Sequence, residues 1–463
     1  MKKPDSYKCR ASGVKTPHFK NTAMYAPKAI PVPAEVKLPM LMHTGTPANP
    51  VVKAGDYVKV GQVIGEASGF VSSPVHASVS GTVKSIDTLD GLTGEKSVSI
   101  TITSDGSQTP WEGIAPVAVT NLKEFLEAVR NSGVVGLGGA GYPTAPKFTL
   151  KETVNLDYIL VNGAECEPYI TSDTRTMVDE TGFVWEGVLL MKEYLKPKNI
   201  IICIENNKSE AINKFNNLCE GMDGVSVRVL PSLYPQGERK VLVYNVTGRI
   251  VPEGGRLPDV GCIVVNCTTV ATFAKYIKTG CPLVTKCITV DGSAVNNPQN
   301  IIAPIGTPVR NILEFCGLIS LSESGKPLPE AKSKNNIKKI TLGGPMMGVA
   351  IPNIDVPIVK ITNAIIAFSE KDAEPPEPGP CIKCGRCIFK CPMKLMPPFI
   401  ENAFELKKPE LLKKFKVNMC AECACCAFTC PAKRPLAQVM TLSKNMLWEY
   451  EQAKASLEKK EAK

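Results

Sequence analysis

Short β-rich runs alternate with turn residues from about Ile30 to Ile102. Two stretches show this best, NPVVKAGDYVKVGQVIGEA and SSPVHASVSGTVKSI, in which Val and Ile lie between Gly, Pro and Ser. The two stretches are similar to each other, and each ends in a Val/Gly turn. The pattern therefore predicts a small β domain with an internal near-repeat.

A connector with Pro and Trp, SQTPWEGIAP, ends this pattern. Helical spacing begins in NLKEFLEAVRNS, where Thr120 or Asn121 can cap the helix. The strand-like runs LDYILVNG, KNIIICIE, VSVRVLP and GCIVVNC follow. Helical stretches at 176–195, 208–219 and 268–279 alternate with these runs. This alternation is typical of an α/β sheet.

A smaller unit is expected from Lys286 onward. The runs KCITVDG and KKITLGGPMMG flank one helix at 308–316, with Thr307 as its N-cap and Gly317 as its C-terminal stop. We expect a separate α+β unit here. The stretch AEPPEPGP at 373–380 is predicted to be an extended linker, because its prolines remove backbone donors and fix φ.

The composition is that of a folded protein, and 463 residues suggest several domains. The start, MKKPDSYKCRASG, is not followed by an apolar segment, and nowhere do eighteen apolar residues run together. We therefore expect a soluble protein without an export signal. Eighteen cysteines without such a signal indicate metal ligation in a reducing compartment rather than disulfides.

The net charge of +10 is concentrated near the end of the chain, where residues 381–463 hold 16 Lys and Arg against eight Asp and Glu. Part of this charge is expected to balance metal-bound thiolates in the same segment, because each thiolate is negatively charged. The remainder is expected to face an acidic electron carrier or an anionic membrane surface. Nucleic acid is excluded as a partner because the lysines come without interleaved aromatic residues.

The spacing C-x2-C-x2-C-x3-C occurs twice, each time followed by proline. Three cysteines spaced in this way can surround one cubane, while the fourth reaches the opposite cluster. The spacing predicts two 4Fe-4S clusters. The first is assigned to Cys381, Cys384, Cys387 and Cys430, and the second to Cys420, Cys423, Cys426 and Cys391.

A pair of zinc sites is the alternative for these cysteines. Zinc sites normally pair two C-x2-C knuckles and need neither the third cysteine nor the proline, so clusters are favoured. Cys425 is expected to be a packed thiol rather than a ligand. Lys383, Arg386 and Lys390 are expected on solvated surface, where they could also raise a cluster potential.

The segment GLGGAG fits G-x-G-x-x-G through Gly136, Gly138 and Gly141, and also contains Gly139. A Rossmann site is rejected, because the loop follows a helix instead of a strand. Prolines at 143 and 146 also make a regular helix directly after it doubtful. An ordinary turn is the alternative for the glycines taken alone.

GLGGAGYPTAPKF and YILVNGAECEP, followed in order by YPQGERKVL and VVNCTTVAT, closely resemble the flavin-bearing subunit of respiratory complex I. The N-terminal β domain resembles the barrel-sandwich hybrid of biotinyl and lipoyl carriers. Its stretch 67–75 lacks their lysine, so we expect a docking scaffold and no carrier function. With the unit ending in GGPMMG and the twin cluster motif, the chain resembles the RnfC family, the C subunits of Rnf complexes.

The resemblance implies a multidomain α/β and α+β fold. The implied chain has four domains. An N-terminal barrel-sandwich hybrid β domain occupies 1–115, and an FMN/NADH-binding α/β domain like that of the complex I flavin subunit occupies 116–284. A β-grasp (SLBB-like) domain follows at 285–372, and a two-4Fe-4S ferredoxin-like helical domain at 373–463.

The resemblance also implies which residues bind FMN and NAD(H). Glycines allow backbone N–H groups to approach the ring and phosphate of FMN. The implied cofactor-binding residues are the four loop glycines, Tyr142 for stacking, Lys147 for the phosphate, Asn162, Asn266 and Thr269 for FMN, and the acids Glu165, Glu167 and Glu238.

Three positions depart from the complex I pattern. Ala164 replaces an Asp, Arg239 replaces a second Glu, and Leu150 replaces an aromatic residue. FMN is thus better supported than NADH. Cys166, between two of the acids, is expected to be a small buried residue.

The implied function is that of a peripheral subunit of an ion-translocating ferredoxin:NAD oxidoreductase on the cytoplasmic side of the cell membrane. Electrons would pass between NAD(H), FMN and two 4Fe-4S clusters, with membrane and iron-sulfur subunits as partners and ferredoxin as an indirect one. A cobalamin reductase of the propanediol-utilisation type is one alternative, although its barrel-sandwich part follows the clusters. A non-catalytic iron-sulfur conduit is the other.

Overall fold

The computed structural model describes residues 11–91, 96–319 and 337–461, and these form two compact units. The first unit contains residues 11–17, 230–256 and 374–461, and the second contains residues 18–229 and 257–373. The predictions that fall on residues 1–10 and 320–336 lie outside the described residues.

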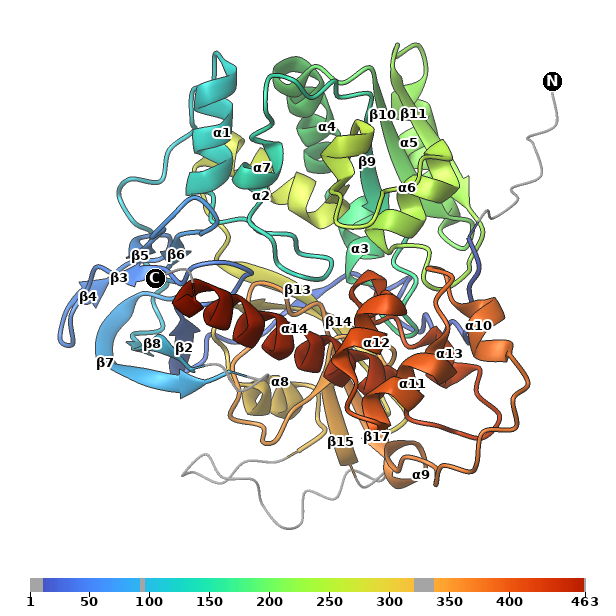
Figure 1. The fold of residues 1–463 in the computed structure, drawn as a ribbon. Coiled ribbons are helices and arrows are strands. Elements are labelled where there is room, and N and C mark those ends of the chain that lie inside the picture. Colours follow the sequence, from blue (N-terminus) through green and yellow to red (C-terminus); the bar gives the residue numbers. More distant parts are fainter. Residues whose placement is uncertain (1–10, 92–95, 320–336, 462–463) are drawn as a thin grey trace. The chain divides into compact units, whose positions relative to one another are not determined.

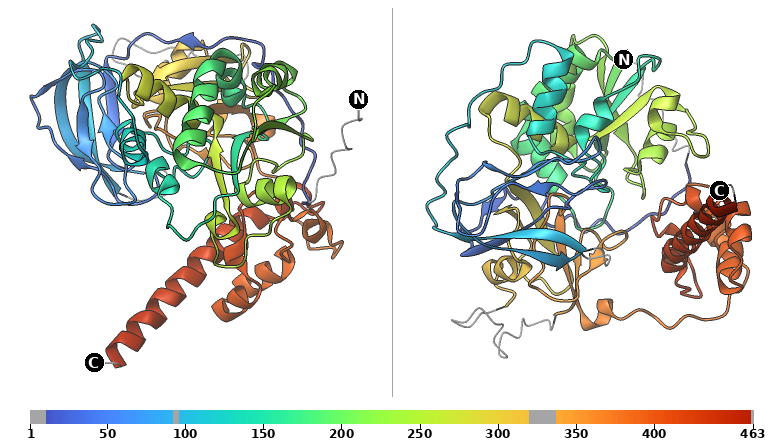
Figure 2. Two further views of the ribbon diagram at one scale, coloured as in Figure 1. Left: turned by 90° about the horizontal axis from the view of Figure 1, so that it is seen from above. Right: turned by 60° about the vertical axis from the view of Figure 1, so that its left-hand side comes forward.

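The N-terminal part of the second unit is the predicted β domain (Figures 1 and 2). Val36, Leu38, Ile100 and Ile102 are fully buried between its strands, because alternate residues of each strand point inward. One antiparallel sheet has the order β2 (Glu35–Pro39), β8 (Lys96–Ser104), β7 (Gly81–Asp90) and β4 (Tyr57–Val58). The other sheet contains β3 (Asn49–Pro50), β5 (Val63–Glu66) and β6 (Val75–His76).

The stretch 67–75, where carrier proteins have their lysine, is held by the rest of the unit. Arg130 donates to the carbonyl oxygen of Phe70 at 2.9 Å, and the hydroxyl of Ser73 donates to that of Gly133 at 3.0 Å. The buried amine of Lys360 donates to the carbonyl oxygens of Pro74 at 2.6 Å and Gly133 at 2.7 Å. The stretch is therefore tied to the rest of its unit, and a docking role for the β domain stays a prediction.

The predicted α/β sheet is present, with all four expected strands. Its order is β11 (Val225–Leu230), β10 (Asn199–Glu205), β9 (Tyr158–Gly163) and β12 (Cys262–Asn266). β9 pairs in parallel with both β10 and β12. The chain runs from β9 outward to β11 and then returns to the opposite side of β9. The strand order therefore reverses between β9 and β12.

The helices around this sheet follow the predicted stretches, with one difference. Asn121 caps the first helix by accepting the N–H of Glu124, but the stretch 176–195 belongs to two helices that meet at Glu180. The helices are α1 (Leu122–Asn131), α2 (Thr144–Phe148), α3 (Ser172–Asp179), α4 (Thr181–Leu195), α5 (Ser209–Cys219) and α7 (Cys267–Thr279), with a 3-10 turn at Leu257–Val260.

The β-grasp region forms a six-stranded sheet, of which the sequence pattern predicted only two strands. β1 near the N-terminus extends this sheet by pairing in parallel with β14. In order, the strands are β1 (Lys28–Ala29), β14 (Gln299–Pro304), β13 (Thr285–Asp291), β17 (Ala364–Ser369), β15 (Ile337–Leu342) and β16 (Val349–Ala350). α9 (Glu370–Ala373) follows β17.

The helix of this region, α8 (Val309–Phe315), corrects one prediction. Thr307 is not its N-cap, because its hydroxyl donates to the carbonyl oxygen of Pro304 at 2.7 Å, and Pro308 precedes the helix without a side-chain cap. Gly317 ends the helix as predicted, with a φ of 68° that favours glycine.

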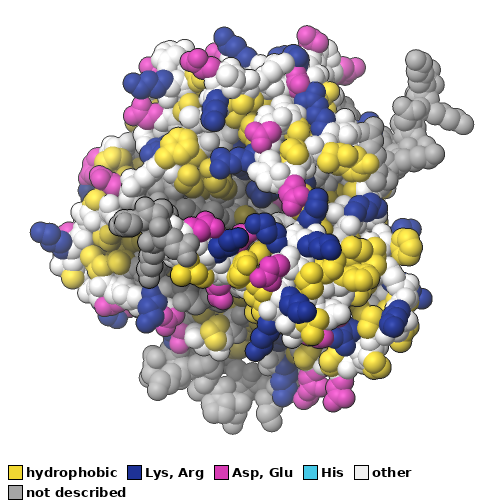
Figure 3. All heavy atoms as spheres, viewed as in Figure 1, with side chains coloured by type: hydrophobic (Ala, Val, Ile, Leu, Met, Phe, Trp, Pro, Cys, Tyr) yellow, Lys and Arg dark blue, Asp and Glu magenta, His cyan; other side chains and the backbone are white. Residues whose placement is uncertain are grey.

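The C-terminal part of the first unit is helical, as predicted, around buried Ile400, Leu412, Val417 and Leu447. Figure 3 shows Lys and Arg side chains among hydrophobic ones over the surface formed by α10 to α13. The helices are α10 (Arg386–Lys390), α11 (Pro397–Glu405), α12 (Pro409–Lys414), α13 (Cys425–Phe428) and α14 (Leu436–Glu461), with a 3-10 turn at Val417–Met419. Across the described ranges, no helix combines the length and apolar character needed to cross a membrane.

Segment 230–256, which includes α6 (Arg239–Thr247), groups with the cysteine-rich part and not with the rest of the predicted α/β domain. Val14 and Tyr234 exchange two backbone hydrogen bonds of 2.8 and 3.0 Å. The thiol of Cys425 lies 3.8 Å from the carbonyl oxygen of Tyr234, and Lys416 pairs with Glu253 at 2.8 Å. These contacts join segments that are distant in sequence.

Candidate functional site

Two asparagines lie side by side where the strand order of the α/β sheet reverses. Asn162 and Asn266 are register partners at the carboxyl ends of β9 and β12. In open α/β sheets, ligands bind outside the carboxyl ends of the strands at such a reversal. Both residues were predicted to bind FMN, and the fold places them where a ligand is expected.

The glycine loop is fastened to this edge by Thr269. The hydroxyl of Thr269 donates to the carbonyl oxygen of Val135 and accepts the N–H of Leu137, both at 3.0 Å. The N–H of Thr269 donates in turn to Oδ1 of Asn266 at 3.1 Å, which caps α7. The predicted residues Asn266 and Thr269 thus position the loop against the sheet.

The four loop glycines have different structural reasons to be glycine. A Cβ atom at Gly138 would lie 2.5 Å from Nδ2 of Asn266, and Gly141 has a φ of 65°. A Cβ at Gly136 would meet nothing closer than 3.6 Å, and one at Gly139 nothing within 4 Å. Packing therefore explains Gly138 and Gly141. At Gly136 a Cβ would make ordinary van der Waals contacts, whereas Gly139 leaves open space, as the approach of a ligand to the backbone requires.

Lys147 and Tyr142 flank the loop. The sequence made a helix after the loop doubtful, but Lys147 lies in the last turn of the short helix α2. Its amine donates to the carbonyl oxygen of Val264 in β12 at 3.2 Å. The carbonyl oxygen of Tyr142 accepts the N–H of Gly136 at 2.9 Å, and the Tyr142 side chain is half-buried. The amine of Lys147 and the backbone of Tyr142 are thus held near the loop.

The carboxylate of Glu165 is turned toward the start of α3. It accepts the N–H groups of Asp173 at 2.6 Å and Thr174 at 3.2 Å, and the Thr174 hydroxyl also donates to it. Burial raises the pKa of Glu165 to about 7, and Asp173 adds to this, while Lys20, Lys208 and the Thr174 hydrogen bond oppose it. Glu165 supplies the cap that the N-terminal residue of α3 does not provide.

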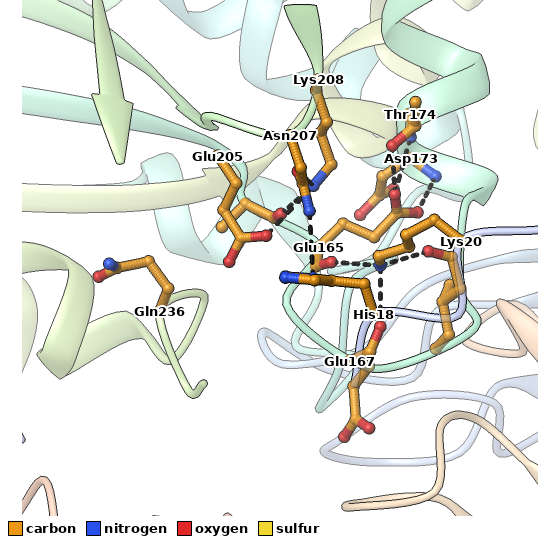
Figure 4. Close-up of polar contacts among 12 residues, drawn as sticks. His18, Lys20, Glu165, Glu167, Asp173, Thr174, Glu205, Asn207, Lys208 and Gln236 are labelled. Carbon is orange, nitrogen blue, oxygen red and sulfur yellow. Dashed lines mark hydrogen bonds and ion pairs between the residues drawn. The ribbon is translucent and has the colours of Figure 1, made fainter. Parts of the chain in front are cut away.

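The carboxylate of Glu167 has different hydrogen-bond partners from that of Glu165. Its carboxylate points away from that of Glu165 (Figure 4). It accepts the N–H of Met346 at 3.1 Å, so it holds the GGPMM turn of the β-grasp region. The resemblance implies that both acids bind the cofactors, and within the second unit their carboxylates accept hydrogen bonds from different neighbours.

Two lysines that the sequence did not single out, half-buried Lys20 and buried Lys208, hold the loop carrying these acids (Figure 4). The amine of Lys20 donates to the carbonyl oxygens of Glu165, Glu167 and Ile170 at 2.7, 2.8 and 2.6 Å. The amine of Lys208 donates to that of Ala164 at 2.7 Å and pairs with buried Glu205 at 3.3 Å. An isolated lysine far along the chain gives no sequence signal for such a contact.

Asp173, at the start of α3, was also missed. Its carboxylate accepts Nδ2 of Asn266 at 2.7 Å and the hydroxyl of Thr268 at 2.6 Å. Since Glu165 binds the backbone of Asp173 and Asp173 binds Asn266, a continuous chain of hydrogen bonds joins the acidic loop to the glycine loop.

Glu238 belongs to the first unit, whereas the other predicted flavin residues belong to the second. Its buried carboxylate caps α6 by accepting the N–H groups of Lys240 at 2.8 Å and Val241 at 2.9 Å. Burial raises its pKa, and these hydrogen bonds and Arg239 oppose the shift. The pKa of the Cys423 thiol lies below its usual value, chiefly because of a hydrogen bond with the Cys425 thiol, and the charge of Glu238 opposes this shift. A role at flavin stays a prediction for this residue.

The two cysteine motifs form one structure repeated at an interval of 39 residues. Positive φ values occur at equivalent positions: 56° and 53° at Lys383 and Glu422, 71° and 59° at Gly385 and Ala424. Alternation of this kind turns successive N–H groups toward one point and creates an anion-binding concavity. The backbone of both loops thus fits an anionic cluster.

The fourth cysteine of each motif lies near the other motif. Burial raises the pKa of the Cys420, Cys426 and Cys387 thiols. A smaller contribution in the same direction comes from the charge of Cys391 on the first two and from that of Cys430 on Cys387. One cavity is lined by Cys391 together with Cys420, Cys423 and Cys426.

Backbone N–H groups point at these sulfurs. The N–H of Leu395 donates to Sγ of Cys391 at 3.4 Å, and that of Glu422 donates to Sγ of Cys420 at 3.3 Å. Such hydrogen bonds stabilise thiolates. Among the described side chains, no three His, Cys, Asp or Glu converge on a single metal ion. Cys425 is buried and is not part of the repeat, as predicted.

Comparison with known proteins matches three family models in chain order. The RnfC barrel sandwich hybrid domain matches residues 10–107, the Nuo51 FMN-binding domain 129–275 and the SLBB domain 287–350.

Three relatives cover most of the chain. The C subunit of the proton-translocating ferredoxin:NAD(+) oxidoreductase complex of Clostridium ljungdahlii is 37% identical over 382 residues, 82% of this chain and 80% of the relative. The Na(+)-translocating counterpart of Acetobacterium woodii is 36% identical over 389 residues, with 83% and 85% covered. The C subunit of the ion-translocating oxidoreductase complex of Klebsiella pneumoniae is 34% identical over 392 residues, with 83% and 50% covered. The barrel-sandwich domain precedes the other matched domains, as the sequence indicated. The chain belongs to the RnfC family, the C subunits of ion-translocating ferredoxin:NAD(+) oxidoreductase complexes.

Proposed function

We propose that this chain is the peripheral NAD(H)-interacting subunit of an Rnf complex, with FMN bound in the second unit and two 4Fe-4S clusters in the first. The observation that carries the proposal is the glycine loop at the strand-order reversal. Thr269 and Asn266 hold this loop, and at Gly139 it leaves open space beside the backbone. The matched FMN-binding family model and the relatives' names support it.

Within the second unit, each residue contributes by position and charge. Backbone N–H groups of the glycine loop and the amine of Lys147 would hold a phosphate, because both present positive charge at the loop. Asn162 and Asn266 would bind polar edges of the ring, and Tyr142 would stack on an aromatic face. When bound, FMN accepts a hydride and releases single electrons.

NAD(H) would bind with few specific side-chain contacts. Ala164 is fully buried where complex I relatives have an Asp, and Leu150 packs against the core where an aromatic residue is expected. Glu165 and Glu167 are engaged with α3 and the GGPMM turn. The nicotinamide nucleotide would therefore rely mainly on contacts with the flavin and the exposed backbone around Gly139.

In the first unit, the two loops would each hold one cluster with three cysteines and receive the fourth from the other motif. One cluster would take Cys381, Cys384, Cys387 and Cys430, and the other Cys420, Cys423, Cys426 and Cys391. Backbone N–H groups directed at the sulfurs would stabilise the anionic clusters. We propose the cytoplasmic face of the membrane as the location, with the membrane and iron-sulfur subunits of the complex as partners and ferredoxin as an indirect one.

The test is an anaerobic preparation of the full chain reconstituted with iron, sulfide and FMN. We expect resolved flavin absorbance above the broad cluster absorbance, and bleaching of the flavin bands by NADH with reduction of an artificial acceptor. A preparation with about eight irons per chain but no retained FMN and no response to NADH would instead support a non-catalytic conduit.

A further inference from the structure

The two cysteine loops have the same backbone but different surfaces. Ile382 and Phe389 in the first loop are 65% and 76% exposed. Their equivalents 39 residues later are Ala421, which is half-buried, and Phe428, which is 46% exposed. Cys381 and Cys384 are also exposed, whereas the equivalent cysteines are half-buried or buried. The first loop therefore presents apolar side chains and its cysteines to solvent.

The charges of the two loops differ as well. Lys383, Arg386, Lys390 and Lys394 carry positive charge, and no Asp or Glu occurs between residues 378 and 400. The positions equivalent to Lys383, Arg386 and Lys390 hold Glu422, Cys425 and Thr429. Because the second loop has the same fold without these cations, cluster binding does not require them.

The second loop is covered by its own unit. Cys425 lies against the carbonyl oxygen of Tyr234, and Glu422 pairs with Lys444 and accepts the hydroxyl of Thr441 at 3.0 Å. In contrast, the described part of the chain provides no hydrogen bond or ion pair to the side chains of Lys383, Arg386 and Lys390. All three are exposed. An exposed apolar and basic surface without partners marks an interaction site.

We propose that the loop Cys381–Lys390 is the docking surface for an acidic electron-transfer protein of the complex. Carboxylates of the partner would pair with the three cations, and its apolar surface would pack on Ile382 and Phe389. The proposal rests on the proposed function, because it assigns the exposed cysteine motif as the end of the chain's electron path. One electron would pass between this loop and an iron-sulfur or flavin group of the partner, with no bond formed or broken.

A protein fits better than a membrane surface. The exposed cysteines lie among the cations, so a partner held by these cations is brought next to the electron-transfer site. An anionic lipid headgroup would gain nothing from that proximity. The charge also favours rapid association, since complementary charges steer an encounter.

The test uses the complete complex in its membranes, with this chain present as wild type or as the variant K383E/R386E/K390E. The matched control is K407E/K408E/K414E, which reverses three exposed cations of the same unit. We expect about tenfold weaker retention of the first variant on the membranes as salt is raised, and wild-type retention of the control. Equal retention of the two variants would overturn the proposal.

A second measurement identifies the partner. Carbodiimide joins amines to carboxylates in direct contact, so peptide mapping of the treated wild-type complex should show Lys383 or Lys390 coupled to Asp or Glu of another subunit. Coupling only within this chain, or retention on protein-free vesicles of anionic lipid that depends on the same three cations, would contradict the proposal. Iron content and NADH-dependent flavin bleaching of each isolated variant should match wild type. If the wild-type chain itself lacked iron or NADH-dependent flavin bleaching, that result would contradict the proposed function and not the docking surface.

Discussion

The hydroxyl of Thr269 accepts the backbone N–H of Leu137 at 3.0 Å, which ties the first turn of α7 to the glycine loop. The same hydroxyl donates to Val135, so one side chain satisfies two backbone groups of the loop. The position of the loop therefore depends on a residue 132 positions away.

Replacing Thr269 by Val should release the loop. Two buried backbone groups lose their partner, which costs roughly 1–3 kcal/mol, and we expect FMN to bind about tenfold more weakly. FMN titration by fluorescence quenching measures this. Thr272→Val is the control, because its hydroxyl only returns to the carbonyl oxygen of Thr268 within α7. Equal FMN affinity in both variants would contradict the anchoring role.

Gly139→Ala should leave the fold intact and weaken FMN binding, by about tenfold or more. A Cβ at this position meets nothing within 4 Å of the protein, so only a bound ligand could be displaced. Gly182→Ala is the matched control, because a Cβ at Gly182 also meets nothing within 4 Å. Gly138→Ala should instead lower thermal stability, because its Cβ would lie 2.5 Å from Asn266. If Gly139→Ala bound FMN like wild type, the flavin would not approach this backbone.

Lys20→Met should loosen the loop that carries Glu165 and Glu167. Three carbonyl oxygens lose a charged donor, so we expect local stability to fall by about 3 kcal/mol. Hydrogen exchange of the amides in residues 164–170 measures this directly. The exposed Lys151→Met serves as the reference. Unchanged protection of the loop in Lys20→Met would show that these bonds are not needed to hold it.

Lys360 should make the stability of the second unit depend on pH. Burial lowers its pKa from 10.5 to about 7. Between these values the unfolded chain binds the proton and the folded chain does not, so the free energy of unfolding rises with pH across this window. This gain in stability is lost as the pH falls toward 7.

Urea unfolding of wild type and Lys360→Met at several pH values between 7 and 10 tests this. As the pH rises, the free energy of unfolding of wild type should increase relative to that of the variant by about 1 kcal/mol per pH unit. Lys123 is exposed, so the free energy of unfolding of the control variant Lys123→Met should depend on pH as that of wild type does. A difference between wild type and Lys360→Met that is constant with pH would mean that Lys360 stays charged in the folded chain.

Double substitutions can test the crossed ligand sets. Cys391→Ala with Cys420→Ala removes two ligands of one assigned cluster, so about four irons per chain should remain. Cys391→Ala with Cys381→Ala removes one ligand from each cluster, and both should be lost. Iron analysis of anaerobic preparations distinguishes these outcomes. The reverse pattern would assign each cluster to a single motif.

Local patterns in the sequence determined the element order and predicted the chemistry of the cysteine and glycine loops. The cysteine spacing fixes how three ligands can reach one cluster within a single turn of chain, and strand and helix periods depend on neighbours a few residues apart. The family, the α/β sheet, and the β domain could therefore be predicted. Thr307 shows that prediction can fail even at short range, because its hydroxyl donates to the carbonyl oxygen of Pro304 and does not cap the following helix.

Only the tertiary structure decided which distant groups meet. Lys20 binds carbonyl oxygens about 150 residues away, and segment 230–256 packs with the cysteine-rich part instead of its sequence neighbours. Glu165 and Glu167 are close in sequence, but the carboxylate of Glu165 accepts the N–H of Asp173 and that of Glu167 accepts the N–H of Met346. The physical reason is common to all of these: a buried charge or backbone group must find a partner where the fold brings one, and no local pattern encodes where that will be.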